Sequence, residues 1–223
     1  AIAHKIVEAA DLSAGDTVLE IGPGYGMLTA RLIDKGCSVV AVEIDSHLAE
    51  TLPGRLGNPA GLKVVTADAR RIDLSELLNE ASDYKMVANL PYYAANPIIR
   101  RFLEASIQPS VIVVMVQKEV AEIMIAGPGK MPILSVAVQL YSVPSVICQV
   151  SNSAFRPRPK VSSTVLRLDV LPDLAVPVGD VDGFFSLVRA GFTAPRKKLR
   201  NSLRQGLKGS ALDVEELLTA ANI

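Results

Sequence analysis

The sequence has few cysteines and no long hydrophobic run. Its two cysteines, Cys37 and Cys148, stand apart and match no metal-ligand spacing, so we expect no bound metal and a reducing compartment. The longest uninterrupted apolar stretch, Val111–Val116, is far shorter than the roughly 20 residues that span a bilayer. The N-terminus also lacks the basic and then apolar segments of a secretion signal. These absences predict a soluble cytoplasmic protein that does not contact a membrane.

The sequence also lacks an excess of either charge, because it has 23 basic and 23 acidic residues. A zero net charge alone argues mildly against a nucleic-acid partner. The charges are nevertheless unevenly distributed along the chain. Acidic residues predominate in Glu43–Glu50 and Asp213–Glu216, whereas basic residues cluster in Arg156–Lys160 and Arg196–Arg204.

Alternating short strands and helices predict the fold over the first two thirds of the 223 residues. Strands that alternate with helices in this way form βαβ units and a mostly parallel sheet. We therefore predict an α/β fold with a Rossmann-like sheet, and a final antiparallel pair from Cys148–Val150 and Thr164–Asp169. The other expected strands are Thr17–Ile21, Ser38–Val42, Lys63–Thr66, Lys85–Ala88 and Val111–Val116, and the expected helices include Met27–Lys35, Ser46–Leu56, Leu74–Glu80, Ile98–Ala105 and Lys118–Ala126.

A change of composition near Asp169 predicts a second, smaller domain. The segment Leu171–Gly183 contains two prolines and three aspartates and is typical of a linker. Three short helical patterns follow it, at Phe184–Ala190, Lys197–Leu207 and Val214–Ala221. We predict a large domain over residues 1–171 and a small helical domain over residues 172–223.

A glycine-rich turn follows the first strand, with glycines at Gly22, Gly24 and Gly26. Glycines at such a turn let the backbone approach a ligand closely, and the next helix presents its amide groups. The alternating spacing differs from the dinucleotide-binding fingerprint, and the acidic Glu20 precedes it. The alternative is a tight strand-to-helix turn without a ligand.

Acidic residues end three successive strands: Glu20 in the first, Glu43 in the second, and Asp68, followed by Ala69, after the third. A carboxylate at the end of the second strand can accept the hydroxyl groups of a ribose. The glycine turn has no lysine and no Gly-Lys-Ser/Thr, so it is a poor phosphate site. A nucleoside ligand without pyrophosphate favours S-adenosylmethionine over NAD or ATP.

The fourth strand ends in Asn89-Leu90-Pro91-Tyr92, and two further motifs lie at Phe155–Ser163 and Phe192–Leu203. With the glycine turn, these motifs resemble the small-subunit ribosomal RNA adenine dimethyltransferases, which are class I S-adenosylmethionine-dependent methyltransferases. The stretches Gln117–Ala121 and Leu134–Val136 fit the same family. The resemblance covers nearly the whole chain.

The resemblance implies that the enzyme transfers methyl groups from S-adenosylmethionine to the 6-amino groups of two adjacent adenosines during ribosome maturation. The implied substrate is small-subunit rRNA or the assembling small ribosomal subunit, and we expect a monomer. Asn89 and Leu90 would accept the amine hydrogens, Pro91 would fix the backbone, and Tyr92 and Phe155 would stack on the adenine. The implied cofactor-binding residues are Glu20, Gly22, Gly24, Gly26, Glu43, Asp68, Ala69 and Asn89.

Basic residues next to these motifs are candidates for contacts with RNA phosphates, which position a nucleic acid without reading its sequence. The alternative is an ordinary solvated surface. Together with Phe155, the candidate RNA-binding residues are Arg156, Arg158, Lys160, Arg196, Lys197, Lys198, Arg200 and Arg204.

Two other functions stay open at this point. The target could be large-subunit rRNA, as in the antibiotic-resistance methylases, although the segment from Pro195 to Leu203 favours the small subunit. A non-catalytic RNA-binding or transcription factor could also have this fold, but the intact Asn89–Tyr92 motif argues against it. The sequence begins after the family's usual Gln-Asn-Phe-Leu segment, and we expect the helical domain to be incomplete at its C-terminus.

Overall fold

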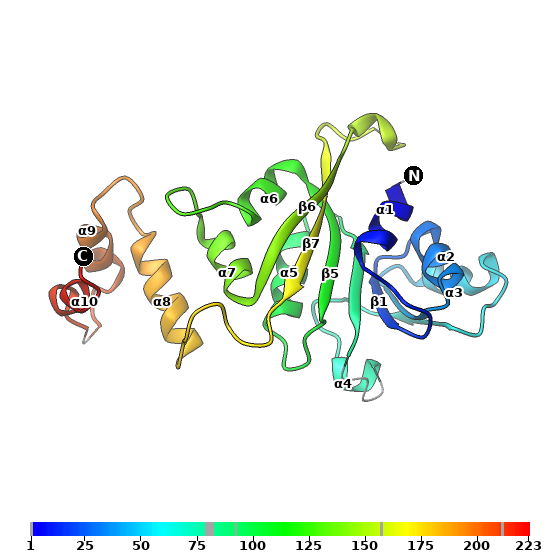
Figure 1. Ribbon diagram of the computed structural model, residues 1–223, viewed down its shortest axis with the longest axis horizontal. Coiled ribbons are helices and arrows are strands. Elements are labelled where there is room, and N and C mark those ends of the chain that lie inside the picture. Colours follow the sequence, from blue (N-terminus) through cyan, green and yellow to red (C-terminus); the bar gives the residue numbers. More distant parts are fainter. Residues whose placement is uncertain (1, 79–82, 92, 157, 211) are drawn as a thin grey trace. The chain divides into compact units, whose positions relative to one another are not determined.

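The computed structural model describes residues 2–78, 83–91, 93–156, 158–210 and 212–223. The chain divides into two compact units, unit 1 over Ala1–Ala175 and unit 2 over Val176–Ile223. Figure 1 shows the helices and strands of both units. Within the described ranges, no helix is both long and apolar enough to cross a membrane.

Unit 1 is built on a seven-stranded sheet in the order β3-β2-β1-β4-β5-β7-β6. The first five strands are parallel, and β7 is antiparallel to both β5 and β6. This arrangement confirms the predicted α/β fold and the final antiparallel pair. The strands are β1 (Thr17–Ile21), β2 (Ser38–Glu43), β3 (Leu62–Thr66), β4 (Lys85–Asn89), β5 (Val111–Gln117), β6 (Ser142–Val150) and β7 (Ser163–Val170).

Helices cover the sheet, with α1, α2 and α3 together on one side and α5, α6 and α7 gathered on the other (Figure 1). On the first side, Ile6 of α1, Leu32 of α2 and Leu52 of α3 are buried in one core cluster with Val18 and Val113 of the strands. The helices of unit 1 are α1 (Ile2–Ala9), α2 (Met27–Asp34), α3 (Ser46–Arg55), α4 (Leu74–Leu77), α5 (Ala95–Leu103), α6 (Lys118–Met124) and α7 (Ile133–Tyr141), with a short 3-10 helix η1 (Asn152–Ala154).

Some predicted boundaries in unit 1 were wrong. Strand β6 begins at Ser142, six positions before the predicted start at Cys148, because Pro144 and Ser145 interrupt the apolar pattern of this largely exposed edge strand. Helix α5 begins at Ala95 rather than Ile98. Helix α4 ends at Leu77, and the predicted end at Glu80 lies outside the described residues.

Unit 2 consists of the helices α8 (Val181–Gly191), α9 (Leu199–Gly206) and α10 (Val214–Ala220). Helix α8 begins earlier than predicted because the Asp180 side chain caps it, accepting the Gly183 amide at 3.0 Å. Helix α9 begins later than predicted, at Leu199. The buried cluster is small and contains Ala190, Leu203, Val214 and Leu218.

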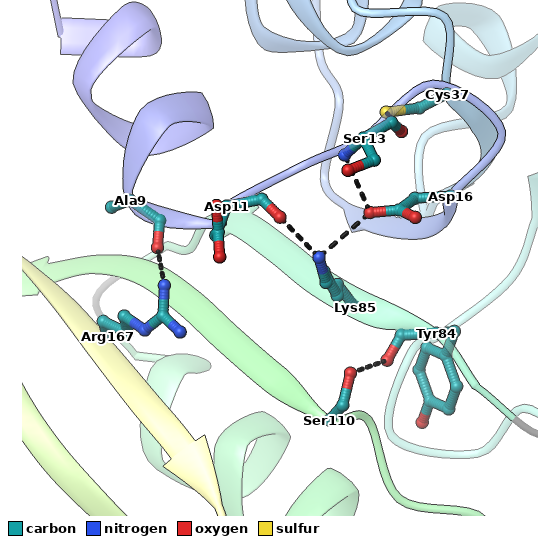
Figure 2. Close-up of polar contacts among 9 residues, drawn as sticks. All are labelled: Ala9, Asp11, Ser13, Asp16, Cys37, Tyr84, Lys85, Ser110 and Arg167. Atoms are coloured by element: carbon teal, nitrogen blue, oxygen red, sulfur yellow. Dashed lines mark hydrogen bonds and ion pairs between the residues drawn. The ribbon is translucent and has the colours of Figure 1, made fainter.

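Charged side chains of β4 and of the antiparallel β7 bind the end of α1 and the segment that follows it (Figure 2). The Lys85 ammonium donates to the Asp11 carbonyl at 2.6 Å and forms an ion pair with Asp16 at 2.9 Å. The Arg167 guanidinium donates to the Ala9 carbonyl at 2.6 Å. A hydrogen bond from the Ser13 amide is the largest cause that lowers the pKa of Asp16, and the hydrogen bond from Lys85 lowers it further. We call this group of contacts the basal network.

Candidate active site

The parallel strands bring the predicted acidic and amide residues to one edge of the sheet. Glu20 lies near the end of β1, Glu43 ends β2, and Asn89 ends β4, while Asp68 follows β3. Two hollows open among these ends. The main cavity, of about 430 Å³, includes Glu20, Gly22, Gly24, Asn89, Phe155 and Arg156 in its lining. The side hollow, of about 90 Å³, includes Gly22, Glu43, Asp68, Ala69, Arg70 and Pro91.

The three glycines of the turn have two different roles. Gly22 and Gly24 have φ values of +70° and +55°, and a Cβ atom added at either would meet nothing within 4 Å. These two glycines therefore face open space in the hollows. Gly26, at φ +83°, is different, because an added Cβ would lie 2.6 Å from the Leu52 side chain. Gly26 lines neither hollow, and its lack of a side chain serves the packing of α2 against α3.

Glu43 is buried and holds two loops together. One carboxylate oxygen accepts the Gly24 amide at 3.0 Å, and the other accepts the amides of Ile44 at 2.9 Å and Asp45 at 3.1 Å. The carboxylate thus joins the glycine turn after β1 to the loop after β2. Asp45 separately caps α3, with its carboxylate accepting the Leu48 amide at 3.0 Å.

Glu20 is the unusual polar group of the site. Its side chain is 1% exposed, and within the described part of the chain neither carboxylate oxygen has a hydrogen-bond partner. Burial raises the pKa of Glu20 to about 7, and the charge of Glu43 adds to this. The hydroxyl and the backbone amide of Thr29 oppose this shift in pKa. A buried carboxyl group without a partner in the walls of a cavity points to a ligand.

Asp68, Ala69 and Arg70 line the side hollow. Arg70 occupies acceptor positions on the Asp68 carboxylate. The Arg70 guanidinium donates to both oxygens of Asp68, the shortest contact being 2.6 Å. This ion pair is the main reason that the pKa of Asp68 falls to about 2. Asp68 is therefore an anion at neutral pH.

The Asn89–Tyr92 motif crosses from one hollow to the other. Asn89 is exposed to the main cavity, Leu90 is buried, and Pro91 is exposed to the side hollow. The Pro91 carbonyl accepts the Ala94 amide at 2.9 Å, which holds the turn into α5. Tyr92, predicted to stack on the target base, lies outside the described residues.

The Phe155 motif contributes to the main cavity through its first two residues. Phe155 packs partly against the core, and Arg156 beside it is exposed. Arg158 instead donates to the Asn152 side chain at 2.7 Å, and Lys160 is exposed without lining the cavity. The structure thus brings two of the four predicted residues of this motif to the site.

The predicted RNA-binding residues of unit 2 fall into two groups. Arg196, Lys197 and Lys198 are exposed in the turn before α9, and not on the helix as predicted. The Lys197 amide donates to the Ala194 carbonyl at 2.9 Å, which closes this turn. On α9 itself, Arg200 and Arg204 both form ion pairs with Glu215 of α10, at 3.3 Å and 2.8 Å.

Sequence reasoning missed several residues of the main cavity. Ile2, Ala3 and Ile6 of α1 form part of its lining, as do Tyr25 and Met115. The helical spacing of the apolar residues in α1 was a usable signal that this helix packs on the sheet. The position of α1 beside the cavity depends on contacts with distant strands, so it could not be predicted from the sequence.

Comparisons with known proteins agree on one family. The family model described as "Ribosomal RNA adenine dimethylase" matches residues 1–221. The chain is 43% identical over 228 residues to ribosomal RNA small subunit methyltransferase A of Alkaliphilus oremlandii, covering 100% of this chain and 79% of the relative. It is 41% identical over 223 residues to the protein of the same name from Dehalococcoides mccartyi, covering 100% of this chain and 76% of the relative.

Two solved structures of similar fold cover almost all of the chain. A dimethyladenosine transferase from Plasmodium falciparum aligns with a TM-score of 0.80 and 27% identity, over 99% of this chain and 80% of the other. The 23S rRNA methyltransferase ErmE aligns with a TM-score of 0.77 and 27% identity, over 100% of this chain and 88% of the other. With the family model and the relatives, these matches show that the chain belongs to the ribosomal RNA adenine dimethylase family.

Proposed function

We propose that this enzyme transfers methyl groups from S-adenosylmethionine to the 6-amino groups of two adjacent adenosines in small-subunit rRNA during ribosome maturation. The observation that carries the proposal is that Asn89 and the buried, unpartnered Glu20 line one cavity. The names of relatives at 41% and 43% identity support the small-subunit target.

The residues of the main cavity fit the methionine part of the cofactor. The buried Glu20 carboxylate has no hydrogen-bond partner among the residues that the structure describes, so an ammonium group would supply the missing charge and hydrogen bonds. Gly22 and Gly24 leave open space where side chains would block the cavity. The bound cofactor supplies an electrophilic methyl group on a sulfonium.

The polar groups at the side hollow suit the adenosine part. A carboxylate has about four acceptor positions, and the amides of Gly24, Ile44 and Asp45 take three of them on Glu43. The remaining position, on the oxygen that accepts Gly24, would receive a ribose hydroxyl. Asp68 keeps its charge beside Arg70 and would accept a hydrogen of the adenine amine, with Ala69 next to it.

The Asn89–Tyr92 motif would act on the target amine. The lone pair of that nitrogen is delocalised into the adenine ring, so the enzyme must orient it for attack. The Asn89 side-chain carbonyl would accept one amine hydrogen and the Leu90 backbone carbonyl another, while Pro91 fixes the backbone angle. These fixed dipoles stabilise the positive charge that develops on the nitrogen. No general base is needed before attack, since the product ammonium loses its proton readily.

Aromatic and basic side chains would hold the RNA. Phe155 in the main cavity, and Tyr92, would stack on the target adenine, which recovers part of the stacking lost when the base leaves the RNA. Arg156 at the same cavity, with Arg158 and Lys160, would contact phosphates. In unit 2, the exposed Arg196, Lys197 and Lys198 would do the same.

The decisive experiment incubates the protein with S-adenosylmethionine and unmethylated small-subunit rRNA, both free and in assembling particles. Mass spectrometry of the nucleosides should then show N6,N6-dimethyladenosine at two adjacent positions. The matched control is the Asn89→Ala variant, which should methylate the RNA about 100- to 1,000-fold more slowly. Absence of methylated adenosine in both RNA preparations would contradict the proposal.

The similarity to ErmE keeps large-subunit rRNA as a second candidate substrate. The same incubation with large-subunit rRNA separates the two, because methylation confined to that RNA would favour the second candidate. A non-catalytic role predicts no methylation of either RNA.

A further inference from the structure

Tyr25 lies at the mouth of the main cavity with its ring largely in solvent. It stands between Gly24 and Gly26, is 73% exposed, and belongs to the cavity lining together with Asn89 and Phe155. Met27, also in the lining, is 79% exposed. Large exposed apolar side chains that gather beside a cavity indicate a contact surface for a ligand.

The backbone on both sides of Tyr25 is fixed by hydrogen bonds. The Gly24 amide donates to Glu43 at 3.0 Å, and the Gly26 amide donates to the Pro23 carbonyl at 2.9 Å. Gly26 is also confined by the Leu52 side chain. The ring is therefore presented on a rigid turn, so little conformational entropy is lost when a partner stacks on it.

A cation accompanies the ring. The Arg55 guanidinium, from the last turn of α3, lies 4.9 Å from the centre of the Tyr25 ring. An aromatic ring beside an arginine is suited to single-stranded nucleic acid, because the ring stacks on a base and the cation attracts the phosphates. An apolar partner would not make use of this charge.

We propose that Tyr25, with Arg55, forms the stacking platform for the nucleotide next to the adenosine that occupies the main cavity. The inference rests on the proposed function, in which two adjacent adenosines are methylated. While one adenosine is in the cavity, its neighbour lies at the mouth and has lost a stacking partner. Tyr25 replaces that stacking partner and so positions the second adenosine for its own methylation.

A fluorescent base tests this directly. The probe is an RNA hairpin whose loop contains an adenosine next to 2-aminopurine, which has no 6-amino group and loses fluorescence when it stacks. With S-adenosylhomocysteine present, the parent protein should quench the probe. Tyr25→Ala should lose most of the quenching and bind the RNA about tenfold more weakly, as expected for one lost base stack. Tyr25→Phe, which keeps the ring, should match the parent.

Two further measurements separate the alternatives. Calorimetry should show that Tyr25→Ala binds S-adenosylmethionine with the parent affinity. A large loss of that affinity, with unchanged quenching of 2-aminopurine, would mean that Tyr25 covers the cofactor and would overturn the proposal. Val143→Ala, at an exposed apolar residue of β6 that is 55% exposed, should quench like the parent.

A hairpin with two adjacent adenosines tests the function itself. If the parent protein does not methylate it or rRNA, both the proposed function and this inference fail. If the parent methylates it but Tyr25→Ala quenches 2-aminopurine as well as the parent, only the stacking platform is refuted.

Discussion

The two ends of the sheet in unit 1 differ in one charged group. Glu43 and Asp68 at the carboxyl end are paired, as the charges at the amino end are, whereas Glu20 has no partner among the described residues. At the amino end, the basal network pairs Lys85 with Asp16, and Lys85 and Arg167 also bind carbonyls at the end of α1 (Figure 2). At the carboxyl end, Glu20 is buried with no hydrogen-bond partner in the described part of the chain, and Tyr25 is left in solvent. Satisfied groups stabilise a fold, whereas unsatisfied groups cost stability and are available to a ligand. The comparison teaches that stability and binding are assigned to different ends of the same strands.

The largest effect is expected at the carboxyl end, from Asn89→Ala. In the proposed mechanism, this change removes an acceptor that acts on the charge developing at the target nitrogen. Loss of one such preorganised group slows a reaction by about 100- to 1,000-fold. Single-turnover methylation measures the rate, and RNA affinity measured in parallel should change about twofold or less. Near-parental transfer of both methyl groups would remove Asn89 from the mechanism.

Glu20→Gln should make the folded protein more stable at pH 8 and, at the same time, weaken its binding of S-adenosylmethionine. The folded-state pKa of about 7 lies above the reference value of 4.5, so the folded protein keeps the proton that the unfolded chain has lost. Stability contributed by this group therefore falls as pH rises from 4.5 to 7 and stays low above that. At pH 8 the variant should be more stable than the parent by about 3 kcal/mol, the equivalent of this pKa difference.

The same variant should bind S-adenosylmethionine more weakly, because glutamine is neutral and cannot pair with an ammonium group. Urea denaturation at pH 4.5 and pH 8 measures the first effect, and calorimetry measures the second. Equal stability of variant and parent at both pH values would contradict the assigned burial cost of Glu20.

Lys85→Met should show the reverse pattern at the amino end. It removes an ion pair and a hydrogen bond to the Asp11 carbonyl, so unfolding should become easier by about 2 kcal/mol. Cofactor affinity of the folded protein should stay within about twofold of the parent value. If Lys85→Met weakened cofactor binding as strongly as Glu20→Gln, the assignment of stability and binding to different ends of the sheet would be wrong.

The smallest effect is expected in unit 2, from joint replacement of Lys197 and Lys198 by glutamate. These exposed lysines should each release about one counterion on contact with a phosphate. RNA binding across a salt series should therefore lose about one unit of log–log slope for each contact removed. Affinity for S-adenosylmethionine should not change. An unchanged slope would make these lysines an ordinary solvated surface.

The hydrophobic pattern predicted the parallel part of the sheet well, because each of its strands is a short β-branched run between turns. Strand β6 was largely missed, since Pro144 and Ser145 interrupt its pattern and an edge strand needs little burial. The acids at the strand ends were visible in the sequence, since parallel strands bring their ends together. The bond from the Gly24 amide to Glu43 was not visible, because it depends on the register of β1 and β2.

The pairing of Arg200 and Arg204 with Glu215 has a consequence for the RNA contacts predicted for these two arginines. Glu215 acts as a counterion that belongs to the protein itself, bound to both arginines before any nucleic acid arrives. A phosphate that reaches these arginines must exchange with a carboxylate rather than with a dissolved anion. Displacing Glu215 costs two ion pairs, so Arg200 and Arg204 should contribute less RNA affinity than Lys197 and Lys198, although each phosphate contact still releases cations condensed on the RNA.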